Sequence, residues 1–421
     1  MKIMIIVGAR PNFMKAAPVV FAIHDHNARI SALPPESQST SERIEVVLVH
    51  TGQHYDEAMS GSFFSDLGLP KPDVHLEVGS GSHAVQTAEI MRRFETVVLD
   101  AKPDFVVVFG DVNSTVACAL VTSKISLDSG AKRPLIAHVE AGLRSFDTAM
   151  PEEINRVITD HLSDLLFVTE ESGRENLHRE GVKPEKVHFV GNTMIDSLLA
   201  SQAKAEKSAV LDQFGLRNTA GPVSRYALLT LHRPSNVDDR ETFLSILEGL
   251  EELSKAYPVL FSAHPRTRKR IEEFGLEHFF RLGQESANAA AAMHTPGIHL
   301  LSPLGYLDFL CLMKHATLVV TDSGGIQEET TGLRVPCVTV RENTERPVTV
   351  THGTNVIAGT DAKDIQKAVA DQLNRPKRSS IPEMWDGRAA ARIVAILAKE
   401  VSRRNAVSAE RKEPISEAAT R

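Results

Sequence analysis

The stretch TLVVTDSGGIQEE, residues 317–329, carries the clearest indication of this chain's architecture. Its apolar run has the length and β-branched content of a buried strand, and it passes directly into Ser-Gly-Gly. The residues after the glycines favour a helix, so the stretch predicts a strand, a tight turn and a helix. This βα unit is the building block of a parallel, doubly wound sheet.

The same turn is a candidate anion site. Glycines let the backbone approach a ligand closely, and the N–H groups at a helix start carry the positive end of the helix dipole. We predict that Ser323, Gly324 and Gly325 donate to a diphosphate and that Glu329, one turn along, accepts from ribose hydroxyls. A tight βα turn with no ligand is the alternative interpretation.

Similar strand candidates recur in two series, with helix-period segments between them. The first series is KIMIIVG (2–8), IEVVLVHTG (44–52), DFVVVFGD (104–111), PLIAHVE (134–140), LLFVTE (165–170) and VHFVGN (187–192). The second is RYALLTLH (225–232), PVLFSAH (258–264), IHLLSP (298–303), TLVVTD (317–322) and PCVTV (336–340). Together they predict an α/β protein with two doubly wound, Rossmann-like domains that face a cleft.

A polar, alanine-rich stretch separates the two series and places the domains at residues 1–198 and 199–376. Residues 377–401 are predicted to contain a C-terminal helix. Residues 402–421 have few apolar side chains and are predicted to be a disordered tail.

Composition narrows the functional classes. The 421 residues are 42% hydrophobic and 24% charged, which is typical of a globular protein with a large core. The net charge of −7 argues against nucleic acid or an acidic membrane as a partner. The first apolar run is too short for a signal peptide or a membrane span, and the three cysteines have no CxxC spacing. We therefore expect a cytoplasmic protein without disulfides.

Basic residues follow two other strand candidates. Arg10 and Lys15 come after the first strand, in GARPNFMK, and Arg346 follows a later strand, in RENTERPVT. Because the carboxyl ends of parallel strands meet at one edge of a sheet, we expect these cations to face the cleft and to contact phosphate or sugar. For Lys15, a solvated position on a helix is the alternative.

Carboxylates gather at the strand ends of the first series. Asp111 and Glu140 each follow a strand and should open onto the cleft, although Asp111 could instead cap the next helix. In MPEEINR, Glu152 and Glu153 follow Pro151 in the first turn of a predicted helix, where one of the two serves only the helix dipole. Apolar residues continue that helix at helical spacing: Ile154, Val157, Ile158, Leu162 and Leu165.

One histidine stands at a strand end of the second series. His232 can stabilise a leaving group there, with a purely structural histidine as the alternative. No histidine pair has metal spacing and HExxH is absent, so we expect no metal and no cofactor. VGSGSHA (78–84) fits a loose dinucleotide fingerprint, but no acidic residue ends the next strand about twenty positions on, where an NAD ribose partner belongs.

Motifs in a fixed order give the chain a family resemblance. Over about residues 1–375 it resembles the non-hydrolysing UDP-N-acetylglucosamine 2-epimerases through GARPNFMKAAPV, TGQHYDEAM, GDVNSTVACAL, HVEAGLR, MPEEINR, GNTMID, LTLHRPSN, DSGGIQEE and ENTERPVT. The resemblance implies a glycosyltransferase-B type fold, with the helix GRAAARIVAILAKEV (387–401) crossing back onto the first domain. It also implies reversible inversion at C2 of UDP-N-acetylglucosamine to UDP-N-acetylmannosamine, through loss and return of UDP and a bound 2-acetamidoglucal.

The resemblance also assigns residues, each by its match to a family motif. It gives acid/base roles to Asp111, Glu140 and Glu152 and places His232 near the diphosphate. The remaining substrate contacts are the phosphate loop Ser323, Gly324 and Gly325, the ribose ligand Glu329, the cations Arg10, Lys15 and Arg346, and Phe309 at the nucleotide. Gln53 and His264 match a second, activating UDP-N-acetylglucosamine site of some bacterial members, and a homodimer is expected by analogy.

Departures and alternatives stay open at this point. The family often has glutamate at the position of Asn12, HRREN in place of HRPSN (232–236), and a glutamine near the uracil at the position of Leu304. An epimerase of a related sugar nucleotide, such as UDP-2,3-diacetamido-2,3-dideoxyglucuronate, is one alternative. A glycosyltransferase of the same fold that uses a UDP-sugar and a non-catalytic sugar-nucleotide sensor are the others.

Overall fold

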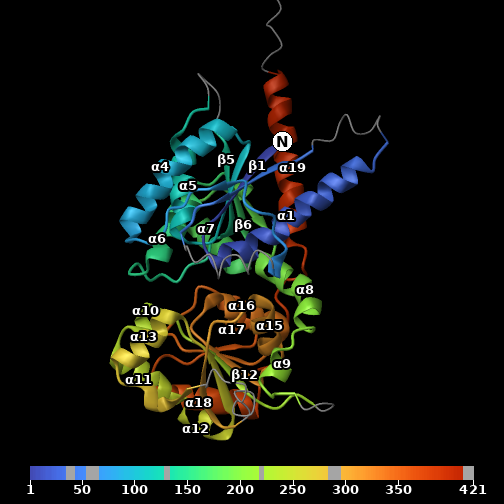
Figure 1. Ribbon diagram of the computed structural model, residues 1–421. Helices are drawn as coiled ribbons and strands as arrows, with labels where there is room; N and C mark the ends of the chain where they lie inside the picture. The colour runs from blue at the N-terminus through green and yellow to red at the C-terminus, as the bar shows by residue number, and fades with distance from the viewer. Residues whose placement is uncertain (35–42, 54–65, 128–132, 218–221, 283–294, 411–421) are drawn as a thin grey trace, which may run out of the picture.

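A computed structural model describes residues 1–34, 43–53, 66–127, 133–217, 222–282 and 295–410. The described residues form two lobes, each built on a seven-stranded parallel sheet. The first lobe comprises β1 to β7 with their helices, and the second comprises β8 to β14 with theirs (Figure 1). The expected α/β fold of two doubly wound sheets is confirmed.

The first sheet has the strand order β3-β2-β1-β4-β5-β6-β7. Strand β4 reads FVVVF and is buried throughout, as expected for a parallel sheet covered on both faces. Chain order reverses between β1 and β4, which makes their carboxyl ends the switch point where such sheets bind ligands. The elements are β1 (Lys2–Val7), α1 (Arg10–Ser31), β2 (Glu45–His50), β3 (Val74–His75), α4 (His83–Ala101), β4 (Phe105–Phe109), α5 (Asn113–Lys124), β5 (Leu135–Ala141), α6 (Pro151–Leu162), β6 (Leu165–Val168), α7 (Glu171–Arg179), η1 (Pro184–Lys186), β7 (Val187–Phe189) and α8 (Thr193–Ala205).

The second sheet has the order β10-β11-β9-β8-β12-β13-β14, with its switch point between β8 and β12. Its elements are α9 (Val210–Gln213), β8 (Ala227–Thr230), α10 (Pro234–Val237), α11 (Arg240–Gly249), α12 (Glu251–Ala256), β9 (Pro258–Ser262), α13 (Pro265–Glu273), η2 (Glu277–Phe279), β10 (Phe280–Leu282), β11 (Gly297–Leu301), α15 (Tyr306–His315), β12 (Leu318–Thr321), α16 (Gly324–Leu333), β13 (Cys337–Thr339), α17 (Pro347–Thr351), β14 (Asn355–Ile357) and α18 (Ala362–Asn374). Every strand predicted from the sequence is present. Strands β3, β10 and β14, of two or three residues each, were not predicted.

Helix α8 connects the lobes. It contacts α1 in the first lobe and α15 and α16 in the second, and its Met194, Ile195 and Leu198 belong to one apolar core that extends from α1 to α15. The helix runs through the predicted division after residue 198, so the domain limits stay a prediction.

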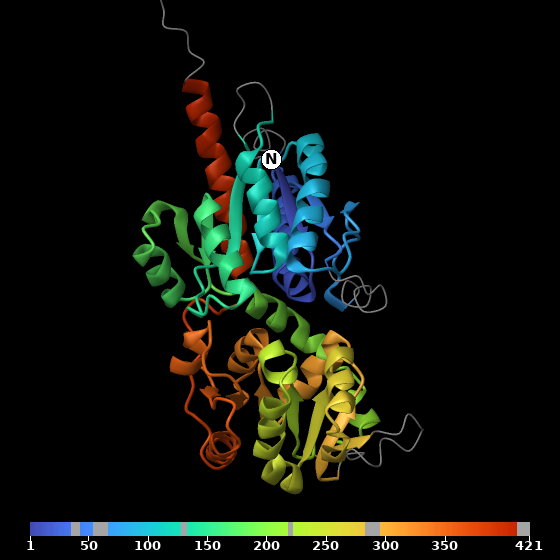
Figure 2. The same cartoon turned by 90° about the vertical axis from the view of Figure 1, so that its left-hand side faces the viewer.

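The last helix, α19 (Ala389–Glu410), packs against α1 of the first lobe (Figure 1), and Figure 2 shows it in red running along that lobe, away from the second. Asp196 of α8 accepts the backbone N–H groups of Ala389 and Ala390 at 3.2 and 2.8 Å and so caps the start of α19. The predicted crossing back to the first lobe is confirmed. A disordered tail from residue 402 is not, because the helix continues to Glu410; residues 411–421 lie outside the described part of the chain.

Candidate active site

Both switch points lie where the lobes meet. Asp111 follows β4 of the first lobe, while His232 follows β8 and Ser323 follows β12 of the second. Across the boundary, Arg346 Nη2 donates to Glu140 Oε1 at 2.5 Å. The carboxyl edges of the two sheets therefore face each other, and they bring together residues far apart in the sequence.

Glu140 takes a strained backbone conformation. Its φ of 73° lies in the left-handed region, and the pairing of β5 with β6 shifts register between Val139 and Ala141. Such a position costs about 1–3 kcal/mol and is commonest at functional sites. The buried carboxylate contacts Lys15 Nζ through Oε2 and Arg346 through Oε1, so one cation from each lobe holds it.

Arg346 is surrounded by carboxylates. Besides Glu140, its guanidinium contacts Glu345 at 2.6 Å and Glu328 at 2.9 Å, and all these side chains are buried. Burial opposes the charge of Arg346, but Glu328, Glu345 and Asp111 outweigh burial and raise its pKa. Arg346 is therefore a permanent cation at the boundary of the lobes.

Glu345 links the arginines of both lobes. It lies 3.1 Å from Arg233, 2.8 Å from Arg341 and 3.9 Å from Arg156 of the first lobe. Burial disfavours its ionised form, yet Arg346, Arg233 and Arg341 hold the pKa of Glu345 well below its usual range. Sequence reasoning gave Glu345 and Arg156 no role, although both stand in the quoted motifs ENTERPVT and MPEEINR.

Asp111 does not cap the helix that follows it. Val112 occupies the cap position of α5, and Asp111 Oδ2 accepts from Arg156 at 2.6 and 3.0 Å. Burial opposes ionisation, but Arg156, Lys15 and Arg346 outweigh burial and lower the pKa of Asp111. The N-cap interpretation is wrong. Asp111 is instead an anion in the charged cluster at the boundary of the lobes, which comprises Lys15, Asp111, Glu140, Arg156, Glu345 and Arg346.

Lys15 is buried, so the solvated alternative is also wrong. A Cβ added to Gly110, at the end of β4, would approach Lys15 Nζ to 2.7 Å, which places the amine against this turn. Burial lowers the pKa of Lys15 to about 8, although the charge of Asp111 opposes the shift. Lys15 therefore changes its charge just above neutral pH.

The two neighbouring carboxylates of MPEEINR have different surroundings. Glu153 is buried, accepts from the backbone N–H groups of Ser145 and Phe146 at 3.0 and 2.9 Å, and contacts Arg156 at 2.5 Å. The Glu152 side chain is half-buried and forms no hydrogen bond or ion pair with any residue that the structure describes. Glu153 therefore stabilises the fold, whereas the Glu152 carboxylate is not engaged by another described residue and can contact a ligand.

Helix α6, which carries both, buries a polar face. Ile154 is 49% and Ile158 37% exposed, whereas Asn155, Thr159 and Asp160 are buried. The apolar spacing of this segment therefore does not mark its buried side. That side faces the polar site, where Asn155 Nδ2 donates to the carbonyl of Asp111 at 2.9 Å.

His232 stands at the second switch point with its side chain 56% exposed. Its Nδ1 lies 2.8 Å from Oδ1 of the fully buried Asp322. Its Nε2 has no hydrogen-bond partner among the residues described here. Sequence reasoning did not single out Asp322, which only the adjacency of β8 and β12 brings next to His232.

The predicted phosphate loop begins α16. Ser323 occupies the cap position without a side-chain hydrogen bond to the helix. A Cβ on Gly324 would lie 2.3 Å from Arg346 Nη1, whereas one on Gly325 would lie 3.6 Å from Met194. Gly324 thus lets the guanidinium pack against the helix start, which places a cation beside the positive end of the dipole.

Glu329 and Phe309 lie on two neighbouring helices, α16, which the loop begins, and α15. Glu329 is buried and accepts from the Tyr306 hydroxyl at 3.1 Å. Burial raises the pKa of Glu329 to about 8, so the carboxyl group is protonated at neutral pH. Phe309 is half-buried on α15 and packs against the core.

The remaining predicted residues occupy different lobes. Arg10 is half-buried at the start of α1, and buried Gln53 accepts from the backbone N–H and hydroxyl of Ser114 at 3.1 and 2.7 Å. His264 is exposed in the second lobe and caps α13 by accepting from the N–H of Arg266 at 3.2 Å.

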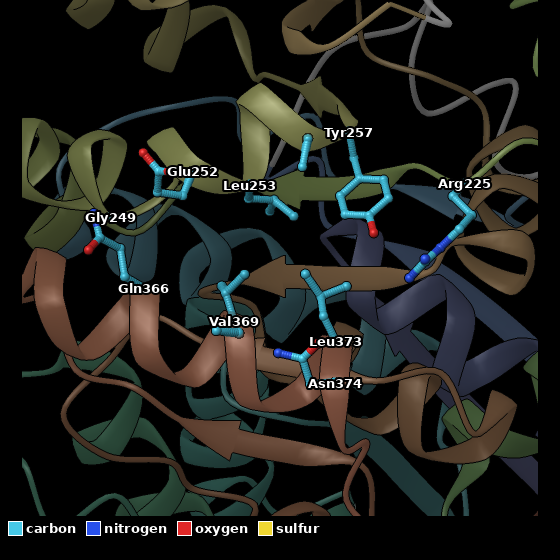
Figure 3. A pocket seen from close by; sticks show the side chains of 11 residues that line it. Arg225, Gly249, Glu252, Leu253, Tyr257, Gln366, Val369, Leu373 and Asn374 are labelled. Atoms are coloured by element: carbon cyan, nitrogen blue, oxygen red, sulfur yellow. The ribbon is translucent and has the colours of Figure 1, made fainter.

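A pocket of about 240 Å³ lies elsewhere, between α12 and α18 (Figure 3). Arg225 and Tyr257, which line it, precede β8 and β9, so this pocket lies at the amino edge of the second sheet. Its apolar floor includes Leu253, Val369 and Leu373. It therefore does not coincide with the charged cluster.

A group of metal ligands and a membrane-spanning helix are both absent from the described residues. These residues contain no group of three or more His, Cys, Asp or Glu side chains that could hold a metal ion. No helix among them is long and apolar enough to cross a bilayer.

Comparison with known proteins gives matches over nearly the whole chain. The family model described as UDP-N-acetylglucosamine 2-epimerase matches residues 36–398. A UDP-N-acetylglucosamine 2-epimerase of Methanocaldococcus jannaschii is 43% identical over 94% of this chain and 99% of its own. A UDP-2,3-diacetamido-2,3-dideoxy-D-glucuronate 2-epimerase of Pseudomonas aeruginosa is 39% identical over 95% and 100%.

Solved structures of UDP-GlcNAc 2-epimerases also match this chain over most of its length. The M. jannaschii UDP-GlcNAc 2-epimerase in complex with UDP-GlcNAc and UDP matches with a TM-score of 0.79 and 42% identity, over 95% of this chain and 100% of that one. The Neisseria meningitidis UDP-GlcNAc 2-epimerase bound to UDP-GlcNAc matches with a TM-score of 0.77 and 28% identity, again over 95% and 100%.

Proposed function

Because this chain belongs to the UDP-N-acetylglucosamine 2-epimerase family, we propose that it interconverts UDP-N-acetylglucosamine and UDP-N-acetylmannosamine. One observation carries the proposal: the carboxylates Asp111 and Glu140 of the first lobe meet Arg346 and the start of α16 in the second. An enzyme that separates a diphosphate from a sugar and moves a proton needs these two groups in one place.

The reaction explains why both are needed. The C2 proton of a hexosamine has no adjacent carbonyl, so it is acidified only as the C1–O bond breaks and its electrons leave on UDP. A carboxylate takes that proton, and the C2–H electrons form the C1=C2 bond of 2-acetamidoglucal. UDP then returns to C1, and a proton reaches C2 from the opposite face. Because one base reaches one face only, inversion needs acids on both faces of the ring.

The site divides into two functions. Asp111, Glu140 and Glu152 are the acid/base carboxylates, and the half-buried, unpaired Glu152 is supported over its neighbour Glu153. The leaving UDP is stabilised by cations and helix N–H groups, because these offset the charge that develops on the diphosphate. The residues with this second function are His232, Arg10, Lys15, Arg346, Ser323, Gly324 and Gly325.

Further contacts follow the same proposal. Glu329 binds the ribose, and because its carboxyl is protonated at neutral pH it can both donate to and accept from a hydroxyl. Phe309 contacts the nucleotide. Gln53 and His264 hold a second UDP-N-acetylglucosamine that activates the enzyme. The enzyme requires no cofactor, acts in the cytoplasm and forms a homodimer.

Proton exchange tests the reaction directly. Incubation with UDP-N-acetylglucosamine in deuterated water should introduce deuterium at C2 and yield the manno epimer by NMR, without NAD or metal. UDP and free N-acetylmannosamine as main products would indicate a hydrolase instead. Conversion of the diacetamido-glucuronate nucleotide alone would favour the activity named for the P. aeruginosa relative. Sedimentation of the whole chain tests the homodimer.

A further inference from the structure

Asp322 occupies a central position at the second switch point. It follows β12, its side chain is completely buried, and its two carboxylate oxygens contact different groups. Oδ2 accepts from the backbone N–H groups of His232 and Arg233, both at 2.9 Å, and from Asn236 Nδ2 at 3.3 Å. Oδ1 faces the imidazole of His232, and Nδ1 at 2.8 Å is its polar contact among the described residues.

This division fixes the proton on the imidazole. Nδ1 and Oδ1 form an ion-pair contact at 2.8 Å rather than a hydrogen bond of good geometry, and because a carboxylate oxygen repels an unprotonated ring nitrogen, this contact favours a proton on His232 Nδ1. Nε2, which has no partner among the described residues, then bears a proton only when the ring is cationic. Burial opposes the charge of Asp322, but the interaction with His232 outweighs burial and lowers the pKa of Asp322. The carboxylate therefore stays ionised next to the ring.

We propose that Asp322 is a positioning residue that holds His232 as an imidazolium, with Nδ1–H on the carboxylate and Nε2–H directed at the departing diphosphate. This inference rests on the proposed function, because it deepens the role of His232 in stabilising the leaving group. A histidine in this state offers a full positive charge as well as a hydrogen bond, and charge is worth most in the transition state, where the diphosphate becomes fully anionic.

Asp322→Asn separates the charge from the shape of the side chain. Because three N–H donors meet the Oδ2 position, the amide oxygen of Asn must occupy it. The NH2 group then faces Nδ1 and requires an unprotonated nitrogen there. The substitution thus moves the proton to Nε2 and leaves the ring neutral. Nε2–H can still donate to UDP, but the positive charge is gone.

The test combines spectroscopy with a double-mutant cycle. In the wild-type chain with UDP bound, two-bond ¹H–¹⁵N spectra of His232 should show both ring nitrogens protonated; in Asp322→Asn they should show the neutral Nε2–H tautomer. The turnover number for epimerisation should fall at least tenfold, whereas the Michaelis constant for UDP-N-acetylglucosamine, whose diphosphate has not yet gained the leaving-group charge, should change less than threefold. In a His232→Asn background, Asp322→Asn should cause no further loss of turnover.

Asn236→Ala is the matched control. It removes one donor to the same carboxylate oxygen and should leave the His232 tautomer unchanged. The proposal is overturned if wild-type His232 with UDP bound lacks a proton on either ring nitrogen, or if Asp322→Asn loses turnover equally with and without His232. The wild-type spectrum decides even if Asp322→Asn does not fold. Failure of the wild-type chain to epimerise would contradict the proposed function, while the tautomer would still report on the pair.

Discussion

Replacing Glu140 with Gln tests whether this carboxylate and the diphosphate compete for the same cation. Arg346 Nη2 lies 2.5 Å from Glu140 Oε1, and both side chains are buried. A diphosphate that binds Arg346 must either displace this carboxylate or accept an anion beside it. Glu140→Gln keeps the size of the side chain and removes the charge. We therefore expect a variant that binds UDP more tightly although it has lost the proposed base.

The expected size of the effect follows from the contact. Two unit charges about 4 Å apart attract by about 4 kcal/mol at an effective dielectric constant of about 20. Lys15 on the other oxygen of Glu140 cancels much of its charge, and Glu345 and Glu328 still contact Arg346 in the variant. If about a third of the attraction is relieved, the gain is near 1.4 kcal/mol, which is a tenfold lower dissociation constant.

Isothermal titration calorimetry with UDP measures this change, and the C2 deuterium assay should show loss of exchange in the same preparation. Glu180→Gln is the control, because Glu180 contacts Arg144 within the first lobe at 2.8 Å and does not bridge the lobes. Its UDP affinity should equal that of the unaltered chain. Unchanged or weaker UDP binding by Glu140→Gln would refute competition for Arg346.

Three further perturbations have distinct outcomes. Because burial lowers the pKa of Lys15 to about 8, this cation is lost as the pH rises through 8. Calorimetry should therefore show that the affinity for UDP falls up to about tenfold between pH 7 and 9 and that UDP binding is accompanied by proton uptake. In Lys15→Met, both the pH dependence of the affinity and the proton uptake should be smaller. Gly324→Ala should lower the free energy of unfolding in urea by about 1–3 kcal/mol, because the new Cβ meets a guanidinium at 2.3 Å, while Gly325→Ala should change it by under about 0.5 kcal/mol. Glu152→Gln should abolish C2 exchange without changing the free energy of unfolding. Glu153→Gln should lower the free energy of unfolding by about 1–3 kcal/mol, because it weakens the acceptor of two backbone N–H groups. Equal stability of these two variants would contradict the division of roles.

Local patterns in the sequence determined the fold class and most strands. The run TLVVTD before Ser-Gly-Gly predicted β12 and the start of α16, because burial, β-branching and glycine act over a few neighbouring residues. The charged strand ends also pointed to Asp111, Glu140 and Arg346, because parallel strands bring their carboxyl ends to one edge. Short strands such as β3 gave no comparable signal.

How those charges pair depends on the packing of the two lobes. The sequence does not indicate that Arg346 lies against Glu140, that Glu153 rather than Glu152 holds the backbone, or that α6 buries its polar side. Asp322 next to His232 depends equally on the adjacency of β8 and β12. The physical reason is range: propensity and periodicity act between neighbours in the chain, whereas a buried charge is stabilised by whichever partner the packed lobes bring within a few ångströms of it.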